Sequence, residues 1–153
     1  MSTREQTLES RGYPLNDAPA PAGLYVPVSV SGNNAYLSGI VPIAGGKLTS
    51  RGKVPSVISI EQATEAAELC AANLLRIFAR DVGPLEQIES VVKVTGFVNS
   101  DSDFTEAHKV MNGASQLLLD VLGNAGNHAR AAVGSATLPL GASVEVEMIV
   151  SLA

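Results

Sequence analysis

Two stretches of the chain carry apolar residues three and four positions apart, the period of a helix that buries one side. In the first stretch, Ser59 and Gln62 fit a capping box at the N-terminal end. Gly83-Pro84 stops the helix, because proline cannot continue it. The apolar stripe of this predicted helix consists of Ala63, Ala66, Ala67, Cys70, Leu74, Ile77 and Phe78.

The second helical stretch is predicted to begin at Asp103. Aspartate is a favoured N-cap residue, and Glu106 then stands at the third helical position. Gly123 marks the end of the helix. Its apolar stripe consists of Phe104, Ala107, Met111, Ala114, Leu118, Val121 and Leu122.

Runs rich in β-branched residues, or alternating in polarity, predict strands over residues 24–30, 35–38, 88–98, 130–137 and 142–150. Ala44-Gly45-Gly46-Lys47 predicts a tight hairpin, because a type I′ turn needs positive φ at both central residues. The last two runs flank the turn Leu138-Pro139-Leu140-Gly141 and are predicted to pair as an antiparallel hairpin.

Strands grouped with two helices predict an α+β fold, with a mixed β-sheet and both helices packed on one of its faces. No repeat or linker interrupts the chain, so residues 1–153 are predicted to form a single domain. Residues 1–23 are polar and end in a stretch rich in proline and glycine. We predict that they form an N-terminal arm or loop.

Composition narrows the class of protein. The chain has a net charge of −5, 46% hydrophobic residues and 16% charged residues, which is too apolar for a disordered chain. The acidic balance argues against nucleic-acid binding, which needs clustered Lys and Arg. No signal peptide is visible, and no apolar run reaches the ~18 residues of a membrane span. We therefore expect a soluble, cytoplasmic protein without a membrane or nucleic-acid partner.

Few side chains are suited to metal binding or nucleophilic catalysis. Cys70 is the single cysteine and falls on the apolar stripe, so we expect it in the core. His108 and His128 could each act as a general base, but neither has a visible nucleophile partner, which favours ordinary surface positions. The P-loop, G-x-G-x-x-G, H-E-x-x-H and G-x-S-x-G motifs are absent. We expect no metal and no cofactor.

The run V-E-V-E in the last strand places Glu145 and Glu147 on one face of the strand. They could lie on a solvated sheet face, or one of them could be a carboxylate in a partly dry cleft with a raised pKa. Arg130 opens the preceding strand. Its planar guanidinium could bind a substrate carboxylate, or form an ion pair with Glu145 or Glu147. The residues alone leave these alternatives open.

These residues stand in an order that resembles the Rid (YjgF) family, formerly called the L-PSP endoribonuclease family. The resemblance extends from about Gly23 to the end of the chain. It rests on Gly23-Leu24-Tyr25-Val26, Tyr36-Leu37-Ser38-Gly39, Val92-Lys93-Val94, Phe97-Val98, Asp103-Phe104 and Leu138-Pro139, and on the 15-residue interval between Arg130 and Glu145.

The resemblance implies a chorismate-mutase-like fold and a homotrimer with clefts at the subunit interfaces. It also implies hydrolytic deamination of reactive enamines and imines, such as 2-aminoacrylate and 2-iminopropionate, to 2-keto acids and ammonia without a cofactor. Arg130 matches the family arginine that grips the substrate carboxylate, and Glu145 matches the glutamate that positions water and moves the proton. Tyr25, Ser38, Gly39 and Asn112 match residues at the cleft.

Two positions depart from the better-known members of the family. Ile40 stands where they carry Gln, and Ala132, a further substrate-binding candidate, stands where many carry Cys. Pocket size and polarity would change at both places. Two other functions are therefore weighed: a trimeric module that binds small keto or amino acids without turnover, and the ribonuclease of the older family name.

Overall fold

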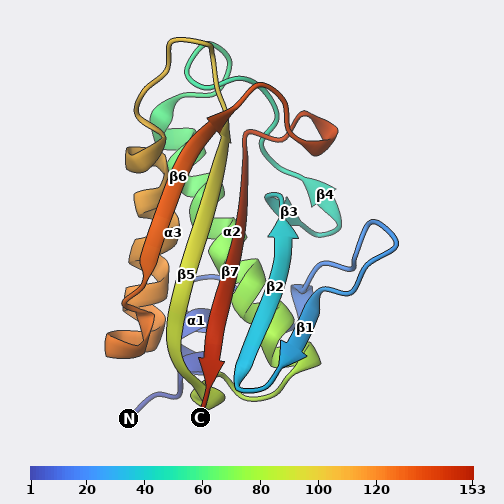
Figure 1. Cartoon of the computed structure of the whole chain (residues 1–153), viewed down its shortest axis with the longest axis vertical. Helices are drawn as coiled ribbons and strands as arrows, with labels where there is room; N and C mark the ends of the chain where they lie inside the picture. Colours follow the sequence, from blue (N-terminus) through green and yellow to red (C-terminus); the bar gives the residue numbers. More distant parts are fainter.

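The computed structural model describes residues 1–153 and contains a five-stranded sheet with two long helices on one face (Figure 1). The strand order is β1-β2-β7-β5-β6. The sheet strands are β1 (Val28–Ser31), β2 (Asn34–Ile40), β5 (Ile88–Asn99), β6 (Ala129–Ser135) and β7 (Val144–Leu152). The long helices are α2 (Ile60–Asp81) and α3 (Ala107–Leu122). The sheet is mixed because β6 runs parallel to β5 while the other pairs are antiparallel. The predicted α+β fold is confirmed.

The core lies between the sheet and the two helices, and the predicted apolar stripes supply much of it. At the start of α2, Ser59 and Gln62 form the predicted capping box. Cys70 is fully buried, as expected. Gly45 and Gly46 both have positive φ and join β3 (Ile43–Ala44) to β4 (Lys47–Leu48), which confirms the short hairpin.

The start of the second helix was predicted wrongly. α3 begins at Ala107 with Glu106 as its N-cap residue, and no side chain caps it. The preceding residues form a turn, in which the Phe104 N–H donates to the Asp101 carbonyl. The Asp101 carboxylate accepts hydrogen bonds from the backbone and the hydroxyl of Ser56. These bonds tie the segment to a neighbouring loop, so Asp103 does not cap the helix.

The predicted hairpin of the last two strands is also wrong, because β5 lies between β6 and β7. Helix α3 carries the chain from β5 across to a parallel β6 (Figure 1). The chain then crosses the end of β5 through a short 3-10 turn, Pro139–Gly141, and β7 inserts between β5 and β2. Arg130 and Glu145 therefore do not lie on neighbouring strands.

The N-terminal segment is more ordered than an arm or loop. It contains α1 (Arg4–Ser10), which Thr3 and Gln6 cap, and a short 3-10 turn at Leu15–Asp17. Leu8 is fully buried, and the Arg4 guanidinium donates to backbone carbonyls at the start of β5. One buried leucine in a helix this short gives no helical period, so the pattern did not predict it. The strand predicted from residue 24 begins only at Val28.

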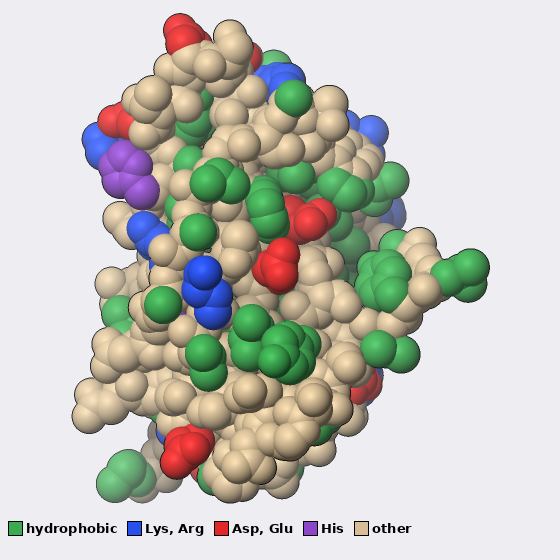
Figure 2. Space-filling model, in the orientation of Figure 1, with side chains coloured by type: hydrophobic (Ala, Val, Ile, Leu, Met, Phe, Trp, Pro, Cys, Tyr) green, Lys and Arg blue, Asp and Glu red, His purple; other side chains and the backbone are tan.

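The second face of the sheet carries no helix (Figure 1), and Figure 2 shows its side chains. Apolar and charged side chains share it, and Tyr36, Val92 and Val133 are each more than two-fifths exposed. β6 is an edge strand, with β5 as its single neighbour in the sheet. The molecule thus has an uncovered sheet face and a free strand edge. None of its helices has the length and apolar character that a membrane crossing requires.

Candidate functional site

Two hollows contain the polar side chains that the sequence singled out. The Arg130 hollow has a volume of about 320 Å³ and lies beside α3 and β6; it is lined by Asn112, Ser115, Leu119, Asn127, His128 and Arg130. The Glu145 hollow has a volume of about 370 Å³ and is lined by Tyr25, Ser38, Gly39, Pro139 and Glu145. Each hollow has the size of a small-molecule site.

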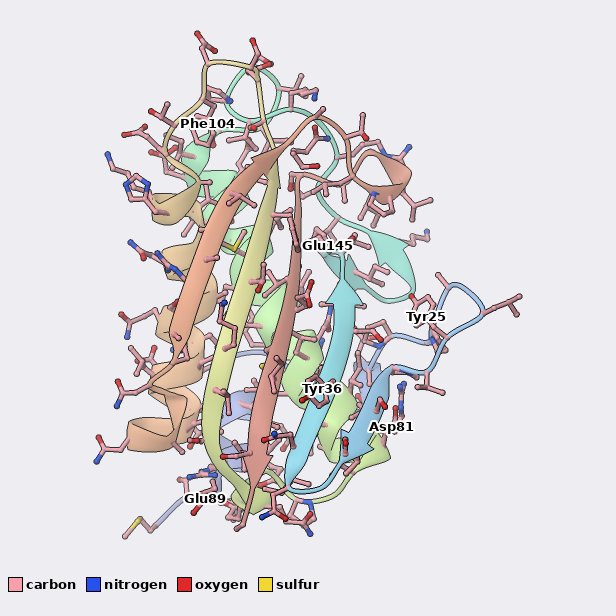
Figure 3. All side chains as sticks on the ribbon, viewed as in Figure 1. Tyr25, Tyr36, Asp81, Glu89, Phe104 and Glu145 are labelled. Atoms are coloured by element: carbon pink, nitrogen blue, oxygen red, sulfur yellow. The ribbon has the colours of Figure 1, made fainter.

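Glu145 points to the uncovered face of the sheet. Its neighbours Val144 and Val146 are fully buried against the helices, and alternate side chains of a strand point to opposite faces. Figure 3 shows Glu145 on β7, near β2. Its side chain is therefore available to a molecule that approaches the uncovered face.

A β-bulge shapes the backbone beside Glu145. Between Leu37 and Ile40, β2 contains one more residue than the matching part of β7. Gly39 lies in this bulge, and a Cβ atom at that position would be only 2.8 Å from Glu145 Oε2. Glycine is thus what allows the carboxylate to lie against the β2 backbone.

The surroundings of Glu145 disfavour its negative charge. Burial raises the pKa of the Glu145 carboxyl, and the negative charge of Glu147 raises it further. No cation or hydrogen bond offsets these two effects. A carboxyl group with a raised pKa keeps its proton to higher pH than an ordinary glutamate, which suits general acid–base catalysis.

Ser38 ties the loop that carries Tyr25 to the sheet. Its N–H donates to the Pro27 carbonyl at 2.9 Å and its Oγ donates to the Val26 carbonyl at 2.7 Å. Tyr25 is half exposed on this loop, ahead of β1 (Figure 3). The tie between loop and strand fixes the wall of the Glu145 hollow that faces solvent.

Arg130 points in the opposite direction, toward α3. It lies beside the buried Val94 in the parallel pairing of β6 with β5, and adjacent residues in a sheet share a face. Its Nη1 donates to Asn112 Oδ1 and to Ser115 Oγ, and its Nη2 donates to the His108 carbonyl, each at 3.0 Å.

These three bonds leave the Nε–H and one Nη2 hydrogen of Arg130 without a partner in the chain. Where these two hydrogens lie on the same edge of the planar guanidinium, they form a fork that matches the two oxygens of a carboxylate. The arrangement can hold an anion without having to order the arginine first.

The predicted site residues therefore divide into two groups within one chain. Tyr25, Ser38 and Gly39 gather around Glu145, whereas Asn112 lies against Arg130. Ala132 packs against the core and lines neither hollow. The single chain does not bring Arg130 and Glu145 together.

Outside these two hollows, the molecule has few groups that could bind a metal ion or a carboxylate ligand. No group of three or more His, Cys, Asp or Glu side chains gathers where it could hold a metal ion. A further hollow of about 410 Å³ lies between α2 and the segment around Ser50. Its lining includes Glu65 but no basic side chain, so it is poorly suited to a carboxylate ligand.

Comparison with known proteins assigns the fold to a family. A family model described as "YjgF/chorismate mutase-like, putative endoribonuclease" matches residues 5–152. Protein TCP17 of Trypanosoma cruzi is 40% identical over 148 residues, which cover 95% of this chain and 91% of that protein. The RutC family protein y4sK of Sinorhizobium fredii is 31% identical, over 90% of this chain and 94% of its own length.

The chain belongs to the YjgF family. Among solved structures, protein Atu1372 of Agrobacterium tumefaciens, described as of unknown function, has 44% sequence identity and a TM-score of 0.88, covering 98% of this chain and 92% of its own. A Shewanella oneidensis protein named as a "putative endoribonuclease" has 28% identity and a TM-score of 0.93, covering 99% of this chain and all of its own. The chorismate-mutase-like fold implied by the sequence is thus shown.

In this YjgF-family chain, sequence reasoning missed one polar contact in the Arg130 hollow. Ser115 Oγ lies 2.8 Å from His128 Nε2, and His128 Nδ1 lies 2.6 Å from the Gly126 carbonyl oxygen. The pair joins the middle of α3 to the residue that precedes β6. No short motif marks this contact. The one available signal was that His128 and Arg130 are two residues apart at the start of a strand.

Proposed function

We propose that this protein hydrolyses imines and enamines of small carboxylic acids to 2-keto acids and ammonia. The observation that carries the proposal is Arg130, whose guanidinium is fixed by three hydrogen bonds and keeps N–H donors free for a carboxylate. The half-buried Glu145, with its raised pKa, supplies the matching acid–base group. Family membership supports the same function through the matched positions of Arg130 and Glu145.

The proposal requires a second copy of the chain. Arg130 and Glu145 lie in different hollows on opposite faces of the sheet, so one substrate can meet both only where two protomers touch. The two hollows are different patches. An interface that joins unlike patches is heterologous, and it forms a ring when the rotation between protomers closes. This agrees with the homotrimer that the resemblance implies. The free β6 edge and the uncovered sheet face are the surfaces available for it.

Hydrolysis of an imine requires these residues to bind the substrate, to activate water and to protonate the leaving nitrogen. The free fork of Arg130 binds the substrate carboxylate and orients the C=N bond. Glu145 of the neighbouring protomer takes a proton from water, and the oxygen of that water bonds to the imine carbon. The protonated Glu145 then delivers that proton to nitrogen, which gives a carbinolamine. Glu145 next takes the proton of the carbinolamine hydroxyl and passes it to nitrogen as the C–N bond breaks, so that ammonia leaves and the keto group forms. An imine carbon is already electrophilic, so no covalent nucleophile is needed for this reaction.

The direct test is the release of ammonia and 2-keto acid while a dehydratase generates the imine in the same vessel. We expect the protein to speed both releases equally, and expect Arg130→Ala to lose this effect. The proposal is wrong if the purified protein does not accelerate release, or if Arg130→Ala behaves like the wild type.

The two alternatives give different results in the same experiments. A binding module without turnover would bind a small keto acid through Arg130 and be indifferent to Glu145→Gln. A ribonuclease would cleave RNA and lose that cleavage in Arg130→Ala. The net charge of −5 argues against RNA as the substrate, because phosphate binding needs clustered cations.

A further inference from the structure

The hydrogen bond between Ser115 and His128 has a defined direction, with the serine hydroxyl as donor and the histidine ring as acceptor. His128 Nδ1 lies 2.6 Å from the Gly126 carbonyl, which can only accept a hydrogen bond. In the neutral ring, Nδ1 therefore carries the hydrogen, and Nε2 presents its lone pair to Ser115 Oγ at 2.8 Å.

Arg130 imposes the same direction from the other side. Its Nη1 lies 3.0 Å from Ser115 Oγ, and a guanidinium can only donate. The Ser115 oxygen accepts that bond, and its one hydrogen is left for His128 Nε2. Two independent constraints thus produce a hydroxyl group whose proton is aimed at a base. The base itself is oriented by a third group, which is the arrangement of an activated nucleophile.

No other serine in the chain has this environment. The hydroxyls of Ser50 and Ser90 pair with other serine hydroxyls, and that of Ser38 donates to a backbone carbonyl. Ser115 lines an open hollow of about 320 Å³ together with His128 and Arg130. The pair is therefore accessible to a small molecule, and all of its parts come from one chain.

We propose that Ser115 and His128 form a nucleophile–base pair that hydrolyses small esters bearing a carboxylate group. Ser115 Oγ bonds to the ester carbonyl carbon while its proton passes to His128 Nε2. His128 then gives this proton to the departing alcohol oxygen as the C–O bond breaks, which leaves an acyl group on Ser115. Water, deprotonated by His128, releases the acid and restores the serine.

Arg130 serves this reaction in two ways. Arg130 Nη1 donates to Ser115 Oγ before the reaction, and once Ser115 Oγ has bonded to the ester, Nη1 can donate to the carbonyl oxygen instead and stabilise the negative charge that develops there. The free fork formed by Nε and Nη2 holds the carboxylate of the substrate. This activity goes beyond the proposed imine hydrolysis and uses neither Glu145 nor a partner chain. Both proposals use Arg130, but loss of Glu145 should abolish imine hydrolysis and leave ester hydrolysis intact, which distinguishes them.

The test is acylation by two chromogenic esters, p-nitrophenyl hemisuccinate and the neutral p-nitrophenyl butyrate. We expect a burst of nitrophenol, one acyl group per chain by mass spectrometry, and peptide mapping of that group to Ser115. His128→Gln should slow acylation about 10²-fold or more. The exposed Ser102 provides the matched control, and Ser102→Ala should acylate like the wild type. Wild-type protein should prefer the charged ester by about tenfold, a preference that Arg130→Leu removes.

Ser115→Cys gives an independent measurement. Cys70 is fully buried, so the introduced thiol is the one accessible to alkylation. Iodoacetate should alkylate this variant faster than Ser102→Cys, and His128→Gln should remove the difference. The proposal is overturned if wild-type protein gains no acyl group on Ser115, or if acylation proceeds at the same rate in His128→Gln. In either case the Ser115 hydroxyl serves only to hold Arg130.

Discussion

The Arg130 hollow and the Glu145 hollow hold their central charged groups in opposite ways. Arg130 is fixed by three hydrogen bonds at 3.0 Å to Asn112, Ser115 and the His108 carbonyl, all from the same chain. Glu145 is half buried, has no cation or hydrogen bond to favour its charge, and lies near a second carboxylate. One group is fixed in position by hydrogen bonds, and the other has no partner for its charge.

Under the proposed function, this difference gives the two groups different tasks. A cation that is already oriented loses little freedom when it binds an anion, so Arg130 is suited to binding. A carboxyl group with a raised pKa exchanges its proton readily, so Glu145 is suited to proton transfer. Substitutions in the Glu145 hollow should therefore act mainly on kcat, and substitutions in the Arg130 hollow mainly on KM.

The largest effect is expected from Glu145→Gln, which keeps the shape of the side chain and removes its acid–base function. We expect kcat for imine hydrolysis to fall about 10²–10⁴-fold with little change in KM. Ammonia release measures this, and Glu89→Gln, an exposed carboxylate at the far end of the sheet, is the control (Figure 3). A loss confined to KM would contradict the assignment.

Glu145→Gln should also leave the protein folded. The raised pKa means that the folded chain keeps the Glu145 proton at pH values where the unfolded chain has lost it. Ionisation of this group therefore costs stability as pH rises from the ordinary glutamate pKa through the raised one. We expect the Tm of the variant at neutral pH to equal or exceed that of the wild type.

Arg130→Lys should have the next largest effect. Lysine keeps the charge but lacks the planar fork, so we expect kcat/KM to fall about 10–100-fold, with most of the change in KM. Arg51→Lys, an exposed arginine outside both hollows, should change nothing. An unchanged KM in Arg130→Lys would mean that the substrate carboxylate binds elsewhere.

Gly39→Ala tests the geometry of the Glu145 hollow without removing a charged group. The added Cβ would lie 2.8 Å from Glu145 Oε2, and the flexible carboxylate can move away while the backbone stays in place. We expect a normal circular dichroism spectrum and about a tenfold loss of kcat, since misplaced catalytic groups lose their alignment. Wild-type kcat would show that the carboxylate does not act from this position.

The smallest effect is expected from Glu147→Gln. Its negative charge raises the pKa of Glu145, so its removal should lower that pKa and shift the corresponding limb of the pH–kcat profile to lower pH. Burial, the larger cause, remains, so the shift should be partial. A shift toward higher pH would contradict this account of the electrostatics.

The sequence predicted helix α2 and the β3–β4 hairpin well, because both depend on residues that are close together in the chain. The apolar period and the Ser59 capping box located α2, and Gly45-Gly46 located the β3–β4 hairpin. The sequence did not predict the order of the strands in the sheet, because that order depends on contacts between residues far apart in the chain. Alternation along the strands beginning at Ala129 and Val144 shows which residues share a face, but not which strand lies beside which.

The candidate site shows the same division. The residue types and the interval between Arg130 and Glu145 could be found in the sequence, and the resemblance gave each a proposed role. Their separation across β5 follows from the insertion of β7 next to β5, which no local pattern encodes. The Ser115–His128 contact also depends on how α3 packs beside β6, and it could not be predicted from single positions.

The most direct test of the central claim, a cleft shared between protomers, is complementation between two inactive variants. Arg130→Ala and Glu145→Gln are mixed by co-expression, and mixed assemblies are isolated and verified by native mass spectrometry. If each site takes Arg130 from one protomer and Glu145 from the next, random assembly into trimeric rings should restore about a quarter of wild-type imine hydrolysis to the whole mixture and about a third to the isolated mixed rings. Verified mixed assemblies that remain as inactive as either parent would contradict the claim.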